Sequence, residues 1–364
     1  MHAPPEGTDV VEIVDTAEEA AELALPPLLV REPVDGFLDA HGLGRGPTEV
    51  RRADEGHSNV TYCLKREGAH VVLRRPPRPP LPPSAHDMLR EARVLRGLEG
   101  SGVPVPRVLA VCEDESLLGV PFYVMEYLDG VTMTKATPPG LASPVCRAAV
   151  AEDMVRALAA LHAVDYAAHG LEGLGRPQGY LERQLRRFAG LWEIGRTRDL
   201  PELDELTAWL RDTLPESGPA TIVHGDYRIG NLMYAETAPV RLLGVLDWEM
   251  ATLGDPLADL GYLCVSWAGG DDADNVITQL QRVTREDGFP DSRRLAALYA
   301  ELTGRSIANL GWYRVLALWK SAIFLEQSFK RFLAGTEHDP WFAGMAEGVP
   351  AIVAQARHEA GLAR

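Results

Sequence analysis

The first third of the chain alternates apolar and polar positions in short runs that are typical of β-strands. The runs TEVRRA (48–53), VTYCLK (60–65) and HVVLRR (70–75) are rich in β-branched residues. Turn-forming residues separate them, because DEGHSN (54–59) precedes the second run and Arg66-Glu67-Gly68 precedes the third. This pattern predicts an antiparallel meander.

The meander is followed by the proline-rich run PPRPPLPP (76–83), which cannot continue a sheet and predicts a stiff connector. The next segment, 86–98, has helical periodicity, and its apolar stripe comprises Met88, Leu95 and Leu98. Glu91 lies on the same face by three- and four-residue spacing. A buried carboxylate needs a cationic partner, since an unpaired buried charge is costly. The alternative is a half-exposed glutamate at the edge of the stripe.

Around and beyond these elements the pattern indicates further structure. A short helix is expected near 34–41 and a strand at 119–128, with a strand-like apolar run at 240–250. Long helical stripes occupy 152–164 and 313–333. The sequence therefore predicts an α+β fold with a small antiparallel β lobe and a larger, mainly helical lobe. We expect a loosely ordered acidic tail at 1–30, a nucleotide-binding N-terminal lobe at 31–126 and a catalytic, substrate-binding lobe at 127–364.

Length and charge narrow the classes of function. The 364 residues are too many for one compact core, which agrees with two lobes. The formal net charge of −16 argues against a broad nucleic-acid-binding face and against attraction to an anionic membrane. No apolar run is long enough to span a bilayer, and the opening residues lack the features of a secretory signal. The four cysteines show no CxxC spacing, so we expect reduced thiols and a cytoplasmic protein.

The loop IVHGDYRIGNLMY (222–234) concentrates reactive groups between two apolar flanks. Taken alone, it has three ordinary explanations: a Gly225-Asp226 turn, a solvated polar loop, or a buried structural His224. However, an asparagine five residues after Asp226, and an aspartate at the end of a later apolar run, match the catalytic-loop pattern of protein kinases.

Phosphoryl transfer needs a base for the acceptor hydroxyl, metal ligands, and positive charge on the phosphates. Asp226 is the candidate base, Asn231 and Asp247 are candidate ligands, and Arg228 or Arg74 supplies the positive charge.

With these motifs in order, the chain resembles the aminoglycoside phosphotransferase and choline kinase-like family over roughly residues 45–335. HGDYRIGN resembles the catalytic loop of that family, LDWEMATLGDPLADL its metal-binding segment, EGHSNVTY its nucleotide loop, and PFYVMEYLDG its last strand and hinge. The resemblance implies a bilobal, protein-kinase-like fold, ATP and Mg²⁺ as cofactors, and a small-molecule hydroxyl acceptor.

Within that family, the segments VLRR, PSAHD and VPVPRVLAVCEDESLLGVPFYVME resemble the kinase-like domains associated with acyl-CoA dehydrogenases. Some members of that subgroup phosphorylate hydroxylated acyl-CoA intermediates. The resemblance therefore implies a hydroxyacyl-CoA or hydroxy acid as acceptor and a functional link to an acyl-CoA dehydrogenase.

The resemblance also implies roles for individual residues. Asp226 is the expected catalytic base, with Arg228 beside it. Magnesium ligands are expected at Asn231, Asp247 and Glu249, and contacts with the nucleotide at Gly56, Ser58, Asn59, Arg74, Glu91, Glu126, Tyr127 and Leu128. Asp255 is expected to cap a helix, Asp259 to brace the catalytic loop, and His224 to act as a scaffold.

Two features depart from the usual kinase pattern. Arg74 stands where a lysine is usual, so it is expected to pair with Glu91 and to hold the phosphates, with the different geometry of a guanidinium. The nucleotide loop DEGHSN has a single glycine.

Several alternatives stay open at this point. The arginine substitution favours a non-catalytic, pseudokinase-like nucleotide-binding module. His224 and Asp226 also resemble two members of a non-haem iron triad, for which the next histidine is His338. An aminoglycoside acceptor is suggested by GGDDADN (269–275), which a solvated acidic loop explains as well. An acyl-CoA would need local positive charge, such as the arginines of 74–78 or 183–187. Whether GTP replaces ATP stays open too.

Overall fold

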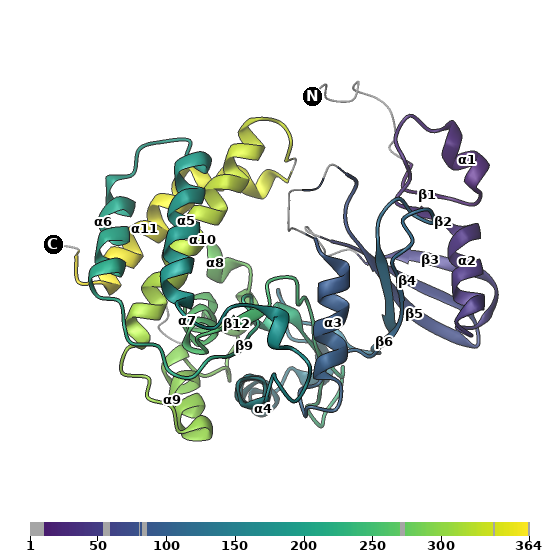
Figure 1. Cartoon of the computed structure of the whole chain (residues 1–364). Coiled ribbons are helices and arrows are strands. Elements are labelled where there is room, and N and C mark those ends of the chain that lie inside the picture. The colour runs from purple at the N-terminus through teal and green to yellow at the C-terminus, as the bar shows by residue number, and fades with distance from the viewer. Residues whose placement is uncertain are drawn as a thin grey trace. The chain divides into compact units, whose positions relative to one another are not determined.

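The structure is a computed structural model of the chain, and it describes residues 11–53, 59–79, 81, 86–269, 274–337 and 339–362. The chain divides into two compact units (Figure 1). The first unit comprises Met1–Arg96 and Pro106–Leu128, and the second comprises Gly97–Val105 and Asp129–Arg364.

A five-stranded antiparallel sheet in the order β3-β4-β5-β7-β6 forms the centre of the first unit. Its strands are β3 (Arg45–Arg52), β4 (Val60–Glu67), β5 (Ala69–Arg75), β6 (Val108–Cys112) and β7 (Phe122–Glu126). The turn between β4 and β5 contains Gly68 at φ +79°, a conformation that side chains with a Cβ rarely adopt. The predicted meander is confirmed, and β6 is an additional strand that the sequence pattern did not predict.

The segment before the sheet is more regular than expected. Within residues 11–30, β1 (Ile13–Val14) pairs in parallel with β2 (Leu29–Val30), and α1 (Ala17–Glu22) lies between them in the sequence. Thr16 caps α1 with a reciprocal capping box. Leu29 is fully buried in the core of the unit. Burial of such apolar side chains explains why this part of the expected loose tail has defined structure.

Two longer helices complete the first unit. They are α2 (Arg31–Ala40) and α3 (Met88–Leu98), whose last two residues belong to the second unit. α2 lies against β3 and buries Val34 and Leu38 (Figure 1). The predicted helical stripe of α3 is confirmed, because Met88, Leu95 and Leu98 are all buried.

The second unit is mainly helical. Its helices are α4 (Pro144–Ala163), α5 (Tyr180–Gly195), α6 (Pro201–Asp212), α7 (Leu257–Ser266), α8 (Val276–Gln279), α9 (Ser292–Thr303), α10 (Leu310–Leu333) and α11 (Met345–Glu359). The long helix α10 packs against α5, α6, α7 and α11 (Figure 1). At its centre Trp319 is fully buried, and its indole Nε1 donates a hydrogen bond of 2.9 Å to Thr207 Oγ1. No helix in the described part of the chain is long and apolar enough to cross a membrane.

Two small sheets in the second unit hold the loops that carry the candidate chemistry. One has the order β11-β10-β8, and the other is the antiparallel pair β9 and β12. Their bounds are β8 (Val131–Thr132), β9 (Thr221–Val223), β10 (Leu232–Tyr234), β11 (Leu242–Val245) and β12 (Thr252–Gly254). The α+β fold class, with an antiparallel β-rich part followed by a larger helical part, is confirmed.

The contact between α7 and α10 depends on a glycine and gives a test of the packing. A Cβ atom added to Gly261 would lie 2.7 Å from the carbonyl carbon and oxygen of Tyr313, which are backbone atoms of α10. Gly261→Ala is therefore expected to lower the free energy of unfolding by about 1–3 kcal/mol, measured by urea denaturation.

Gly190 is the matched control, because it lies inside α5 and a Cβ there would meet nothing within 4 Å. Gly190→Ala should raise stability by about 0.5–1 kcal/mol. Equal effects of the two substitutions would contradict the close approach of α7 and α10.

Candidate active site

The loop that follows β9 is a built structure rather than a solvated segment. It runs from His224 to a 3₁₀ turn at Ile229–Asn231 and leads directly into β10. Gly225 has φ +88°, and a Cβ there would lie 2.9 Å from the backbone oxygen of Met250. Glycine is thus required by both the backbone conformation and the close neighbour.

The Asp259 carboxylate, in the first turn of α7, fixes the start of this loop. It accepts hydrogen bonds from the backbone N–H groups of His224 (2.7 Å) and Gly225 (2.8 Å). Nε2 of His162 lies 3.2 Å from the same carboxylate, which is almost fully buried. Burial alone would raise the pKa of Asp259, but the hydrogen bond and charge of His162 and the backbone hydrogen bond from Gly225 outweigh burial and lower it. The predicted brace is confirmed.

The His224 side chain is a scaffold, as predicted. Its Nδ1 accepts a hydrogen bond from the backbone N–H of Asp226 (3.2 Å). Therefore Nε2 carries the ring proton and donates to the carbonyl oxygen of Leu246 (3.0 Å). With both nitrogens engaged, His224 cannot serve as a metal ligand, which removes the basis of the iron alternative. Among the described residues, no group of three or more His, Cys, Asp or Glu residues could hold a metal ion.

The carboxylate of Asp226 is oriented by two neighbours on the same loop. Its Oδ2 accepts hydrogen bonds from Asn231 Nδ2 (2.8 Å) and Arg228 Nε (3.3 Å). Asp226 and Arg228 are each about one quarter exposed. Burial would lower the pKa of Arg228, but the charges of Asp226 and Asp247 help to raise it. Arg228 thus acts as a permanent counter-ion beside a partly accessible carboxylate.

Strand pairing brings Asp247 next to this loop. Leu232 of β10 pairs with Val245 of β11, and one step further Leu246 donates its backbone N–H to the carbonyl oxygen of Asn231 (2.8 Å). Asp247 follows directly and has φ +64°, which is uncommon for a residue with a Cβ and occurs preferentially at functional sites. The 231 and 247 positions are therefore neighbours in space, as the kinase pattern requires.

These residues suit a hard oxygen-binding cation. Asn231 uses its Nδ2 group on Asp226, so its amide oxygen is the end that can act as a ligand. Asp247 adds a carboxylate, and Glu249 lies two residues further along the chain, at the start of a turn. Mg²⁺ is usually held by one or two carboxylates together with substrate phosphates and water. The donor set fits that requirement, although it is too small for a closed all-protein cage.

The first unit brings together the other group of predicted residues. Arg74 Nε lies 3.2 Å from Glu91 Oε2, and the side chains are 13% and 1% exposed. This confirms the predicted ion pair and the inward direction of Glu91. Asn59 Oδ1 lies 2.8 Å from His86 Nδ1. Burial, and next the charge of Arg74, lowers the pKa of His86, so this imidazole belongs to the same neighbourhood.

The other residues predicted to contact the nucleotide differ in how far the structure describes them. Gly56 and Ser58 lie outside the described residues. The backbone N–H of Glu126 is bonded to the carbonyl oxygen of Arg107 (2.9 Å), so it is used within the sheet. The ring of Tyr127 stacks on His70 at a centroid distance of 3.5 Å.

Sequence reasoning missed three residues that touch or support these groups. Burial, the charge of Asp226 and a hydrogen bond with it raise the pKa of Tyr262 far above its usual value. The sequence contained an indication of this position, because Tyr262 follows Asp259 by three residues and so lies on the same face of the helix. Gln281 accepts from the backbone N–H of Ile229 (2.9 Å), and no motif indicates it. His86 lies inside the quoted PSAHD segment without an expected role.

Comparison with known proteins agrees with this geometry. The signature of the phosphotransferase enzyme family matches residues 49–298. The chain is 35% identical over 322 residues to acyl-CoA dehydrogenase family member 10 of Mus musculus, covering 86% of this chain and 29% of that protein. It is also 35% identical over 297 residues to acyl-CoA dehydrogenase family member 11 of Gallus gallus, covering 80% of this chain and 38% of that protein. The chain thus spans about a third of the length of these relatives.

A solved structure from Ralstonia eutropha, provisionally named an aminoglycoside phosphotransferase, superimposes with a TM-score of 0.78. The two sequences are 33% identical, and the alignment covers 92% of this chain and 98% of the other. The similarity confirms the predicted protein-kinase-like fold class.

The Asp259 brace gives a test of how the loop is held. Asp259→Ala would leave two buried backbone N–H groups and His162 without their acceptor. The free energy of unfolding should fall by about 3–5 kcal/mol, measured by urea denaturation at neutral pH. Asp212→Ala, at the exposed end of α6, should change stability by less than about 0.5 kcal/mol.

The difference in unfolding free energy between the wild type and Asp259→Ala should also depend on pH in a defined direction. Because the folded-state pKa of Asp259 is lowered, its contribution is present above the ordinary aspartate pKa and is lost as the pH falls through the lowered value. A wild type and an Asp259→Ala variant of equal stability at neutral pH would refute the brace.

Proposed function

The chain belongs to the phosphotransferase enzyme family, and from that premise we propose that it transfers the γ-phosphate of ATP to a hydroxyl group of a small-molecule acceptor. One observation carries the proposal: the partly exposed Asp226 carboxylate is oriented by Asn231 and Arg228, beside the strained Asp247. The proposed base and the two proposed oxygen ligands therefore lie on segments that the β10–β11 pairing joins.

The Asp226 carboxylate would act on the acceptor hydroxyl. As the hydroxyl oxygen forms a bond with the γ-phosphorus, its proton passes to Asp226, and the bond from the γ-phosphorus to the bridging oxygen breaks, releasing ADP. Arg228 donates a hydrogen bond to the Asp226 carboxylate and so helps to hold the proposed proton acceptor in place. Asn231 holds one carboxylate oxygen in place, so the direction of the other is defined as well.

Mg²⁺ would be held by the amide oxygen of Asn231 and the carboxylate of Asp247, with Glu249 as a further ligand. When bound, the ion neutralises negative charge on the β- and γ-phosphates. The role of the protein residues is to present oxygen atoms on a backbone that the β10–β11 pairing keeps in register.

The first unit would hold the nucleotide. Arg74 is kept in position by Glu91, and its guanidinium can bind phosphate oxygens bidentately, which the usual lysine cannot do. Because the N–H of Glu126 is used within the sheet, the backbone of Tyr127 and Leu128 is the better candidate for adenine recognition.

For the acceptor, we propose a hydroxyacyl-CoA or a related hydroxy acid and a functional link to an acyl-CoA dehydrogenase. The support is the naming of two relatives as acyl-CoA dehydrogenase family members, of which this chain matches only a part. A transfer screen over hydroxyacyl-CoAs, free hydroxy acids, choline-like alcohols and aminoglycosides tests this choice. Efficient turnover of an aminoglycoside alone would reverse it.

Two substitutions should separate the base from the metal ligand. Asp226→Asn keeps the size of the side chain but removes the proton acceptor, so kcat should fall by about 10²–10⁴-fold while MgATP binding changes little. Asp247→Ala should weaken magnesium-dependent ATP binding and abolish turnover as well. Calorimetry with MgATP, followed by assay with a working acceptor, measures both. Absence of any magnesium-dependent nucleotide binding by the wild type would end the kinase proposal.

The role of Arg74 gives an independent test in the first unit. Arg74→Ala removes the proposed charged contact with phosphate together with the ion pair to Glu91, so the KM for ATP should rise roughly tenfold or more and kcat should fall. Arg96→Ala, at an exposed position of α3, is the control and should leave both constants unchanged. Wild-type kinetics in the Arg74 variant would show that the phosphates are held elsewhere.

A further inference from the structure

A pocket in the second unit is lined by four arginines. Its volume is about 460 Å³, which lies within the usual range of ligand-binding pockets. The arginines are Arg176, Arg183, Arg186 and Arg187, and Tyr180 and Thr252 also line the pocket. None of these residues belongs to the catalytic loop described above.

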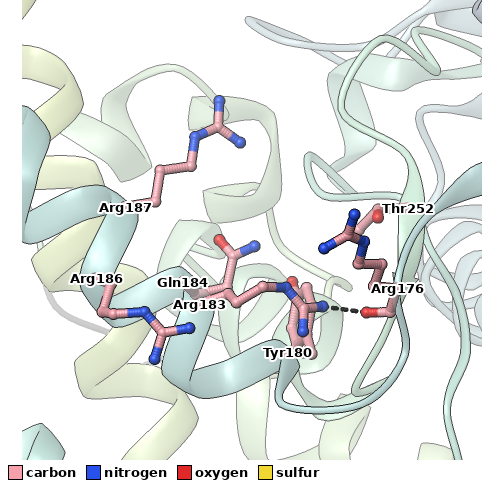
Figure 2. A pocket seen from close by; sticks show the side chains of 7 residues that line it. All are labelled: Arg176, Tyr180, Arg183, Gln184, Arg186, Arg187 and Thr252. Atoms are coloured by element: carbon pink, nitrogen blue, oxygen red, sulfur yellow. Dashed lines mark hydrogen bonds between the residues drawn. The ribbon is translucent and has the colours of Figure 1, made fainter.

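The helix α5 and the turn before it build two walls of this pocket. Arg183, Arg186 and Arg187 follow three- and four-residue spacing on α5, so they project from neighbouring faces of the helix. Figure 2 shows Arg176 on the other side of the pocket, beside Thr252. The guanidinium of Arg183 donates to the carbonyl oxygens of Arg176 and Gln178 and so fixes the turn to the helix.

Within the residues that the structure describes, none of the four guanidinium groups forms an ion pair with a carboxylate. Arg198, just beyond α5, is in contrast paired with the buried Glu326 at 2.9 Å. The chain as a whole carries 52 acidic and 36 basic residues, so four unpaired arginines around one cavity are a local exception. Such a cluster attracts anions and repels cations.

A buried lysine lies within the electrostatic reach of Arg187. The Lys320 ammonium group lies 4.7 Å from the ring centroid of Phe188, between α10 and α5. Burial lowers the pKa of Lys320 to about 8; the charge of Asp259 opposes this lowering and the charge of Arg187 adds to it.

The pocket adjoins the structure that holds the catalytic loop. Thr252 in its wall pairs with Val223 of β9, and Val223 precedes Asp226 by three residues. Three residues span at most about 10 Å, and the bend at Gly225 shortens this span. Tyr180 in the same wall packs against the position of Gly254 at the end of β12. A ligand in the pocket would therefore lie on the order of 10 Å from the Asp226 loop.

We propose that this arginine pocket binds phosphate groups of the acceptor, at a distance from the hydroxyl that reacts. The acceptor class is then a hydroxylated metabolite joined to a nucleoside phosphate, and neither a free hydroxy acid nor a polycationic aminoglycoside meets the requirement. Guanidinium groups bind phosphate oxygens in a planar, bidentate geometry, which explains arginine rather than lysine at these positions. The inference rests on the proposed phosphotransferase function and specifies its acceptor.

Adenosine 3′,5′-bisphosphate is a suitable probe, because it carries separated phosphates on a nucleoside, and its free 2′-hydroxyl cannot be phosphorylated when AMP-PNP replaces ATP. It would be titrated calorimetrically into the full chain with excess AMP-PNP and Mg²⁺, so that the ATP site is occupied. The double variant Arg186→Gln/Arg187→Gln should bind the probe at least about tenfold more weakly, since two charge-assisted contacts are lost. Arg183 is left intact because it also holds the preceding turn.

Arg211→Gln is the matched control, because Arg211 is an exposed arginine at the end of α6, outside the pocket. It should bind the probe like the wild type. With a working phosphate-bearing acceptor, the double variant should show a raised KM for that acceptor, with an unchanged KM for ATP and a similar kcat.

Equal binding of the bisphosphate by wild type and double variant, or no binding by the wild type, would overturn the proposal. Inorganic pyrophosphate binding as tightly as the bisphosphate would also overturn it, because the pocket would then be a simple anion site. These outcomes are independent of phosphate transfer, since the titration needs no turnover. Loss of transfer with intact bisphosphate binding would instead count against the phosphotransferase function.

Discussion

The arrangement of the catalytic loop depends on one buried anion. Asp259 is almost inaccessible to water, yet it holds two backbone N–H groups at the start of the loop and faces His162. A buried carboxylate is tolerable only when its hydrogen bonds and counter-charge are complete. The same requirement lets Asp259 hold the loop in place. A shift of His224 or Gly225 would leave both the Asp259 carboxylate and the two backbone N–H groups without their hydrogen bonds.

Short strands connect the segment held by Asp259 to the proposed catalytic residues. The His224 ring donates a hydrogen bond to the carbonyl oxygen of Leu246. The backbone N–H of Leu246 donates in turn to the carbonyl oxygen of Asn231, beside the β10–β11 pairing. Asp247 follows in a left-handed conformation that would cost energy in isolation and persists because the strands on either side define it. The Asp226 and Asp247 carboxylates thus lie on short loops that directly follow β9 and β11, and the strands on either side position these loops.

The sequence predicts the parts of this molecule that depend on local pattern. The strand meander, the inward-facing Glu91 and its pairing with Arg74 follow from periodicity and from the cost of an unpaired buried charge. The structure within residues 11–30 could not be predicted, because its two-residue strands are stabilised by burial of Leu29 in a core assembled from distant segments. Tyr262 and Gln281 were missed for the same reason. Their roles arise from tertiary contacts with the 226–231 loop, although Tyr262 shares a helical face with Asp259.

Arginine has two physically distinct roles in this chain, and the difference is set by what faces each guanidinium. Arg74 and Arg228 are each paired with a carboxylate, so their side chains are fixed before any ligand arrives, and part of their charge is already compensated. Arg186 and Arg187 line a cavity without such a partner among the described residues. A paired arginine orients its carboxylate partner and attracts an anionic ligand only modestly. A cluster of arginines without carboxylate partners attracts a polyanionic ligand with its full positive charge. A chain with a net charge of −16 can therefore bind anionic ligands, because binding depends on the local arrangement of charge rather than on its sum.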